Sequence, residues 1–108
     1  MIYELRIYHC VAGRLPDLHR RFEHTTLPLW EKHGIRQVGF WTTHIGSANN
    51  TLTYILAWDS VEARESRWSA FQNDPDWIEQ RARSEANGPI VERIENSLLS
   101  ATAYSALR

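Results

Sequence analysis

The segment Thr51-Leu52-Thr53-Tyr54-Ile55-Leu56-Ala57-Trp58 is predicted to be a strand, because its β-branched, aromatic and aliphatic residues are typical of one. Side chains of a strand alternate between its two faces, and one face here carries Leu52, Tyr54, Leu56 and Trp58. The other face carries Thr53, Ile55 and Ala57. Neither set is strongly polar, so we predict that both faces of this strand are covered.

The preceding segment completes a β-hairpin with this strand. Residues 36–45 are rich in β-forming residues, and the run Gly46-Ser47-Ala48-Asn49-Asn50 has the composition of a hairpin loop. Phe40 and Trp41 are neighbours in the segment 36–45 and must point to opposite faces. Large aromatic side chains are therefore predicted on both faces of the sheet.

Residues 2–11 form a further strand by the same alternation. Glu4, Arg6 and Tyr8 lie on one face, with about 7 Å between successive members. The opposite face carries Tyr3, Leu5, Ile7 and His9. The sequence thus predicts a row of three polar side chains on a single face of the first strand.

Apolar residues at helical spacing predict a helix over residues 15–33. Pro28 has no backbone N–H to donate, so we predict an interruption of this helix near residues 25–26. The charged pair Arg20-Arg21 is expected on the solvated surface of the helix.

The remaining segments supply two helices and a strand. Asp59 or Ser60 can cap a helix that runs to about Asn73, with an inner side made of Ala63, Arg67, Ala70 and Phe71. The run Asp74-Pro75-Asp76-Trp77 has the cap and the proline of a new helix, which we extend to about Ala86. The second half of residues 90–104 is predicted to be the fourth strand.

The resulting order, β-α-β-β-α-β with an extra short helix, predicts a ferredoxin-like α+β fold. Right-handed crossovers in this fold place the helices on one face of a four-stranded antiparallel sheet. The other face would then expose more apolar surface than monomers usually tolerate. A second copy of the chain is the cover that we predict, giving a homodimer of one domain that spans residues 1–108. The alternative is that a long loop or the helix of residues 74–86 folds over this face.

The bulk composition narrows the range of partners. The chain has 12 basic and 13 acidic residues and a net charge of −1, which gives no electrostatic reason to bind nucleic acid or an anionic membrane. Cys10 is the only cysteine, and no apolar run approaches the roughly 20 residues that span a bilayer. We therefore expect a soluble, cytoplasmic protein.

Glu4, Arg6 and Tyr8 are the candidate catalytic residues. Arg6 could hold a carboxylate or enolate oxygen, Tyr8 could donate a proton, and Glu4 could fix Arg6 or act as a base. The structural alternative is a buried ion pair and a hydrogen-bonded phenol at the dimer interface. The candidate ligand-binding residues, which could line an apolar cavity or simply fill the core, are Trp41, Tyr54, Leu56 and Trp58.

Sequence patterns give no support for metal or cofactor chemistry. The histidines fall at positions 9, 19, 24, 33 and 44, and no pair has H-x-x-x-H or H-E-x-x-H spacing. A Gly-rich phosphate loop, a CxxC motif and a Ser-His-Asp grouping do not occur either. We therefore predict no metal and no cofactor.

Several motifs carry a resemblance that covers nearly the whole chain. They are Ile2-Tyr3-Glu4-Leu5-Arg6-Ile7-Tyr8, Gly13, Val38-Gly39-Phe40-Trp41-Thr42-Thr43-His44-Ile45-Gly46, Asn50, Ala57, Asp59-Ser60, Arg64, Asp74-Pro75-Asp76-Trp77 and Leu98-Leu99 with Tyr104-Ser105. Together they resemble the NIPSNAP family of small dimeric α+β barrel proteins. The sequence departs from the family pattern at Leu56, where a tryptophan is usual, and at Trp58, where a tyrosine is usual. These departures imply a differently shaped pocket.

The resemblance implies a fold more clearly than a reaction. The wider superfamily includes cofactor-independent monooxygenases, lactone isomerases, polyketide cyclases and haem enzymes, and fold analogy does not choose among them. Our hypothesis is a homodimer that binds a small, largely apolar or aromatic molecule. Cofactor-independent catalysis of the monooxygenase, isomerase or cyclase type would extend this hypothesis. The alternative is a non-catalytic assembly or adaptor module.

Overall fold

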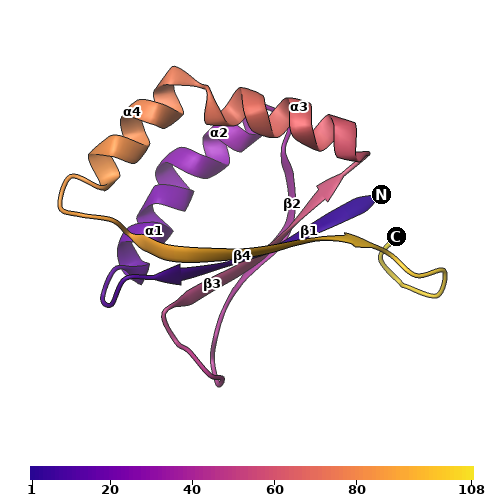
Figure 1. Ribbon diagram of the computed structural model, residues 1–108, viewed down its shortest axis with the longest axis horizontal. Helices are drawn as coiled ribbons and strands as arrows, with labels where there is room; N and C mark the ends of the chain where they lie inside the picture. Colours follow the sequence, from indigo (N-terminus) through magenta and orange to yellow (C-terminus); the bar gives the residue numbers. More distant parts are fainter.

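Two layers make up the protein in the computed structural model, which describes all 108 residues: an antiparallel sheet and a layer of helices on one side of it (Figure 1). The strands are β1 (Ile2–Cys10), β2 (Arg36–Thr42), β3 (Thr51–Trp58) and β4 (Val91–Ser100). The helices are α1 (Leu15–Arg21), α2 (Leu27–Lys32), α3 (Val61–Gln72) and α4 (Pro75–Ser84). A π-helical turn, η1 (Phe22–Thr26), joins α1 to α2.

The strand order in the sheet is β2-β3-β1-β4, which is the ferredoxin-like arrangement. The predicted α+β fold is therefore confirmed. All helices lie on the same side of the sheet, and α4 continues the layer begun by α3 (Figure 1). The ring of Trp77 in α4 lies 4.7 Å from the ring of Phe71 in α3. The alternative in which residues 74–86 cover the open face is thus wrong.

The register of the central strands fixes which side chains face the helices. Arg6 lies opposite Tyr54 on β3 and opposite Asn96 on β4, so these three side chains share a face. The Tyr54 ring lies 5.5 Å from the rings of both Phe22 and Trp30, which belong to the helical layer. The face with Glu4, Arg6 and Tyr8 is therefore the covered face, and the alternation predicted for β1 and β3 is confirmed.

The interruption predicted for the first helix is confirmed and has a defined form. Pro28 cannot donate to the carbonyl four residues before it, so the chain takes a wider turn at this point. The N–H of Leu27 instead bonds to the carbonyl of Phe22, five residues back. This turn changes which side chains of the helix point in the same direction.

Three element details differ from the predictions. β4 begins at Val91 rather than midway through residues 90–104, because its charged side chains can face water on an edge strand. β2 ends at Thr42, so residues 43–45 lie outside it. In α3 Ala70 is exposed, and Trp68 packs inward against Phe71 with 5.4 Å between the ring centroids.

Ser60 caps α3, which settles the choice between Asp59 and Ser60. Its side chain accepts a hydrogen bond of 3.1 Å from the N–H of Ala63. We expect Ser60→Ala to lower the free energy of unfolding by about 1 kcal/mol, measured by urea denaturation. The control is Ser66→Ala on the exposed side of α3, which should cost nothing. Equal stability of the two variants would contradict this role.

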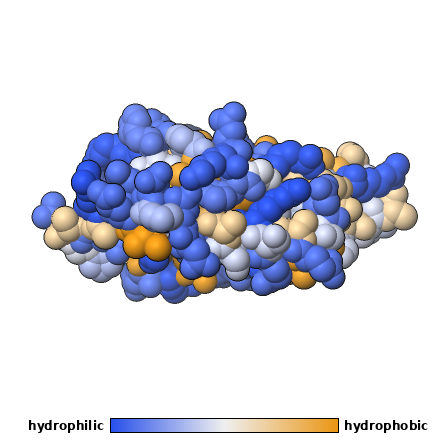
Figure 2. Space-filling view, turned by 90° about the horizontal axis from the view of Figure 1, so that it is seen from above, coloured by the Kyte–Doolittle hydropathy of each residue, from blue (hydrophilic) through white to orange (hydrophobic).

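The two sides of the molecule differ in polarity. The helical side is mostly hydrophilic, with apolar residues in small patches (Figure 2). On the open face of the sheet, Leu5, Ile7 and Ile55 are only half-buried, and Trp41 is 51% exposed. None of the helices combines the length and hydropathy needed to cross a bilayer.

Candidate functional site

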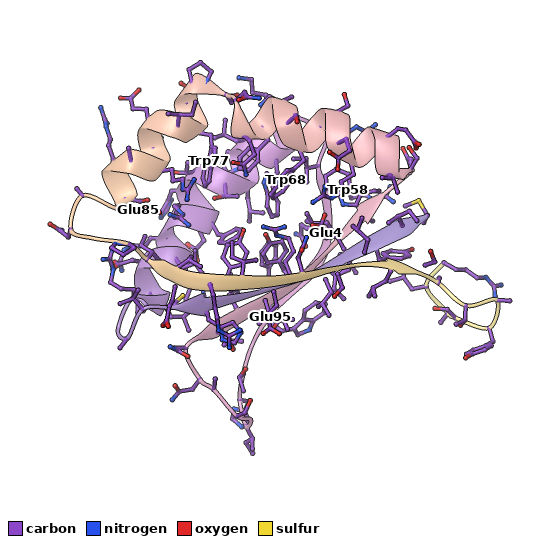
Figure 3. All side chains as sticks on the ribbon, in the orientation of Figure 1. Glu4, Trp58, Trp68, Trp77, Glu85 and Glu95 are labelled. Atoms are coloured by element: carbon purple, nitrogen blue, oxygen red, sulfur yellow. The ribbon has the colours of Figure 1, made fainter.

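A buried carboxylate lies at the centre of a polar network between the sheet and the helices. Glu4 is fully buried and accepts hydrogen bonds from Arg6 at 3.0 Å, Trp58 at 3.0 Å and Asn96 at 2.7 Å. Arg64 binds both carboxylate oxygens, with its Nε at 2.9 Å and its Nη2 at 3.0 Å. Figure 3 shows Glu4 and Trp58 on the side of the sheet that faces α3.

The pKa of Glu4 shows that this network stabilises the negative charge of the carboxylate. Burial alone raises the pKa of the carboxyl, because it disfavours the charged form. The hydrogen bonds from Arg64 and Asn96 and the charge of Arg6 lower it by more, and the pKa falls to about 2. Glu4 therefore stays ionised, with its acceptor positions filled, and is a poor candidate for a base. Its geometry supports the role of fixing Arg6.

Arg6 also joins two tyrosines. Its Nε donates to the Tyr54 hydroxyl at 2.8 Å, and its Nη2 lies 3.3 Å from the Tyr8 hydroxyl. The ring of Trp68 lies 4.7 Å from the guanidinium carbon and stacks over the charge. These contacts hold the guanidinium in one orientation.

The hydrogen bonds of Tyr54 determine what is left for the Tyr8 hydroxyl to do. Tyr54 is fully buried, its oxygen accepts from Arg6, and its own proton goes to Tyr8 at 2.9 Å. Burial raises the pKa of Tyr54 well above its ordinary value, which keeps it a neutral donor. A phenol has a single proton to donate. Tyr8 thus accepts from two neighbours and keeps its own proton for an acceptor outside the network.

Tyr8 lines a cavity of about 390 Å³ between β1, β4, η1 and α4. A ligand in this cavity could supply the acceptor for the Tyr8 proton. Arg6 and Tyr8 lie on its sheet side, and Phe22 and Trp77 supply apolar walls. Its volume is in the usual range for small-molecule sites, which combine apolar walls with a few converging polar groups. We refer to it as the Tyr8 cavity.

The structure brings some of the candidate residues together and separates others. Glu4, Arg6, Tyr8 and Tyr54 form one network, as described above. Leu56 and Trp58 are fully buried core residues and do not line the Tyr8 cavity.

Trp41 points to the open face, opposite Thr53, and lines a separate pocket of about 310 Å³ at the edge of β2. The expectation that Trp41, Tyr54, Leu56 and Trp58 line one cavity is therefore corrected. The register places Phe40, and not Trp41, opposite Tyr54, so Trp41 lies on the other face from the remaining three.

The alternative, in which Glu4, Arg6 and Tyr8 form a buried ion pair and a hydrogen-bonded phenol at the dimer interface, must be corrected in their location. Glu4, Arg6 and Tyr8 do form a buried ion pair with a hydrogen-bonded phenol, but under the helices and not on the open face. Figure 3 shows the contrast, since Glu95 projects from the opposite side of the sheet. The polar row and the apolar open face therefore do not compete for the same surface.

Sequence reasoning missed residues that the helices contribute. Arg21 was expected in solvent, but only 8% of it is exposed, and it lines the Tyr8 cavity with Thr26 and Arg81. A signal did exist: Arg21 lies three residues after the buried Leu18, at helical spacing. Arg64 is among the residues that carry the family resemblance, but neither it nor Asn96 gave a signal of contact with Glu4, because only the tertiary fold brings them together.

Fold and site together define a ferredoxin-like α+β protein with a polar cavity between its sheet and its helices. The sequence profile of the NIPSNAP family matches residues 3–106, and the chain belongs to this family. No curated protein gave a significant match.

Solved structures show the same relationship. Protein Atu4242 from Agrobacterium tumefaciens is 25% identical, with a TM-score of 0.87 over 100% of both chains. An uncharacterized NIPSNAP domain protein from Burkholderia xenovorans is 24% identical, with a TM-score of 0.83 over 97% of this chain and 98% of the other. A candidate antibiotic biosynthesis monooxygenase from Nitrosomonas europaea shares the fold, with a TM-score of 0.64 and 7% identity over 94% of this chain and 98% of that one.

Proposed function

We propose that the protein is a cytoplasmic homodimeric α+β barrel that binds a small molecule with an apolar or aromatic body in the Tyr8 cavity. The observation that carries this proposal is the free donor of Tyr8, held beside the Arg6 guanidinium at the cavity wall. A carbonyl, enolate or phenolate oxygen is the acceptor that such a pair fits.

The same arrangement supports proton-transfer chemistry. When negative charge develops on a substrate oxygen, Tyr8 can donate its proton and Arg6 can stabilise the charge. Glu4 then acts as a positioning residue that keeps Arg6 in place. An isomerase or cyclase type of reaction uses such an oxygen directly, whereas the monooxygenase type is supported by fold likeness alone.

The open face supports the homodimer. Leu5, Ile7 and Ile55 are half-buried in the single chain, and the more exposed Trp41 and Leu99 extend the patch across the sheet. A stable interface buries roughly 800 Å² on each partner, and a second sheet packed on this face would cover these residues together. Assembly through the open face and binding in the Tyr8 cavity use opposite sides of the sheet, so the assembly and ligand-binding hypotheses are compatible.

Tyr8→Phe tests ligand binding, because it removes only the hydroxyl. We expect the affinity for an aromatic ketone or phenol to fall about tenfold. The melting temperature should also fall by several degrees, because the buried Tyr54 hydroxyl loses the acceptor of its hydrogen bond. Isothermal titration calorimetry against a panel of such compounds measures the affinity. The panel should also contain matched carboxylic acids and amides.

The matched control is Tyr3→Phe, which changes a tyrosine of the same strand on the opposite face. This variant should bind like the unmodified protein. Equal affinity of Tyr8→Phe and the unmodified protein, or no saturable binding by any compound of the panel, would contradict the proposal.

A further inference from the structure

Two buried polar atoms of the Tyr8 cavity have no partner in the protein. They are Nε of Arg21 and the side-chain oxygen of Thr26. Arg21 is 8% exposed and Thr26 is 3% exposed, so bulk water does not readily satisfy these groups. A buried donor or hydroxyl without a partner destabilises a fold, and such groups are rare without a reason.

The π-helical turn explains why these two residues share a face. Residues five apart lie about 140° apart around an α-helix, which would turn Thr26 away from Arg21. In η1 the hydrogen bond runs from Leu27 to Phe22 across five residues, so positions five apart lie on the same side of the helix, as positions four apart do in an α-helix. Arg21 and Thr26 therefore both reach the Tyr8 cavity because of the turn that Pro28 induces.

The other contacts of Arg21 leave one edge of its guanidinium free. Its Nη1 donates to Glu85 at 3.1 Å and to the Ser84 hydroxyl at 3.2 Å. The guanidinium carbon lies 5.6 Å from the ring centre of Trp77, which supports the group from α4. Figure 3 shows Trp77 and Glu85 together at this end of the helical layer. The free edge, with Nε and Nη2, is the fork that binds a carboxylate through two parallel hydrogen bonds.

The charge of the cavity favours an anion. Arg6, Arg21 and Arg81 line it, and Glu85 is the only acidic residue among its lining side chains. Glu85 already pairs with Arg21 at 3.1 Å and lies 3.5 Å from Arg81. The positive charges therefore exceed the negative ones where a ligand would lie.

We infer that Arg21 and Thr26 form a carboxylate-binding subsite, and that the ligand is an aromatic or hydrophobic carboxylic acid. The carboxylate accepts from the free edge of Arg21 and from the Thr26 hydroxyl, while the apolar body packs against Phe22 and Trp77. An oxygen elsewhere on the ligand meets Tyr8 and Arg6. This inference rests on the proposed function, since it names the class of molecule that the Tyr8 cavity binds.

The test compares cinnamate with cinnamamide, which share a planar body and differ in the charged group. By titration calorimetry the unmodified protein should bind cinnamate at least about tenfold more tightly, because charge-assisted hydrogen bonds are stronger than neutral ones. Thr26→Val should weaken cinnamate binding about tenfold and leave the affinity for cinnamamide unchanged.

Stability gives a second readout that a merely structural role of Thr26 would not produce. Valine keeps the shape of threonine and removes an unpartnered hydroxyl, so the melting temperature of Thr26→Val should stay the same or rise. Thr25→Val is the matched control, because Thr25 is the neighbouring residue in η1 and does not line the Tyr8 cavity. It should not change cinnamate binding.

The outcomes separate this inference from the proposed function. Equal affinities for cinnamate and cinnamamide, or full cinnamate affinity in Thr26→Val, would overturn the carboxylate subsite. Neutral ketones or phenols that still bind in a Tyr8-dependent manner would then leave the proposed function standing. If no compound of either class binds, both are overturned.

Discussion

Replacing Glu4 with glutamine is expected to lower the free energy of unfolding by roughly 3–5 kcal/mol, a large effect for a change of one atom. The carboxylate neutralises two buried or half-buried cations, since Arg6 and Arg64 both bind it at about 3.0 Å. Glutamine offers one acceptor oxygen and no charge, so it leaves Arg6 without a counter-ion and Arg64 with only the exposed Glu65. Removing one partner of a buried ion pair is costly because the other charge stays desolvated.

Urea denaturation at neutral pH measures this loss. The control is Glu62→Gln, an exposed residue of α3 that makes no ion pair, which should change stability by less than about 0.5 kcal/mol. If Glu4→Gln were no less stable than the control, the network would contribute nothing to stability and Glu4 would be retained for another reason.

The stability difference between the unmodified protein and Glu4→Gln should depend on pH, and this dependence tests the role of Glu4 independently. The pKa of Glu4 is lowered from 4.5 to about 2 by folding, so its contribution to stability is fully present above pH 4.5. It is lost as the pH falls through the window from 4.5 to 2, because the folded protein must then take up the proton. Glu4→Gln has no such group, so the stability difference between the two proteins should shrink by roughly 3 kcal/mol across this window. A constant difference would contradict the assigned pKa.

The fold was predictable because its signals are local. The alternation in residues 2–11 and 51–58 assigns each side chain to a face, and Pro28 alone predicts the break in the first helix. The start of β4 was not predictable in the same way. An edge strand needs no apolar alternation, so its charged residues looked like a loop.

The site was predictable only where one strand supplies it. Glu4, Arg6 and Tyr8 are two residues apart, and strand geometry puts them in a row. Their partners come from far along the chain: Arg64 is 60 residues and Asn96 is 92 residues from Glu4. No local pattern encodes such contacts.

Arg21 and Thr26 show a different limit. The two side chains share a face only because η1 is a π-helical turn. Pro28 indicates that the helix is interrupted, but the sequence does not show that the interruption is a π-helical turn. The interpretation of Arg20-Arg21 as solvated surface failed for Arg21 because a charged residue on a helix is usually exposed.

Substituting lysine for Ile55 should convert the proposed dimer into a monomer. Ile55 lies on the central strand β3 at the open face, opposite Leu5 on β1 and beside Gly39 on β2. In a single chain the ammonium group can extend into water, so the variant should fold. In a dimer each partner would bury an unpaired charge against an apolar sheet, and we expect the dissociation constant to rise by at least roughly 10³-fold.

Sedimentation equilibrium at micromolar concentrations measures whether each protein is a dimer or a monomer. The unmodified protein should have twice the 12.6 kDa mass of the chain, and Ile55→Lys should have the mass of one chain. The control is Ile78→Lys, which makes the same change on the exposed surface of α4 and should leave the dimer intact. An unmodified protein that is already monomeric would contradict the homodimer.

The same variant tests whether assembly and binding are independent. The Tyr8 cavity lies between the sheet and the helices of one chain, and none of its walls belongs to the open face. Monomeric Ile55→Lys should therefore keep its affinity for cinnamate within about twofold, because sites without shared partners behave additively. Loss of binding together with loss of the dimer would mean that the second copy shapes the cavity through the sheet. The site would then belong to the assembly rather than to the chain.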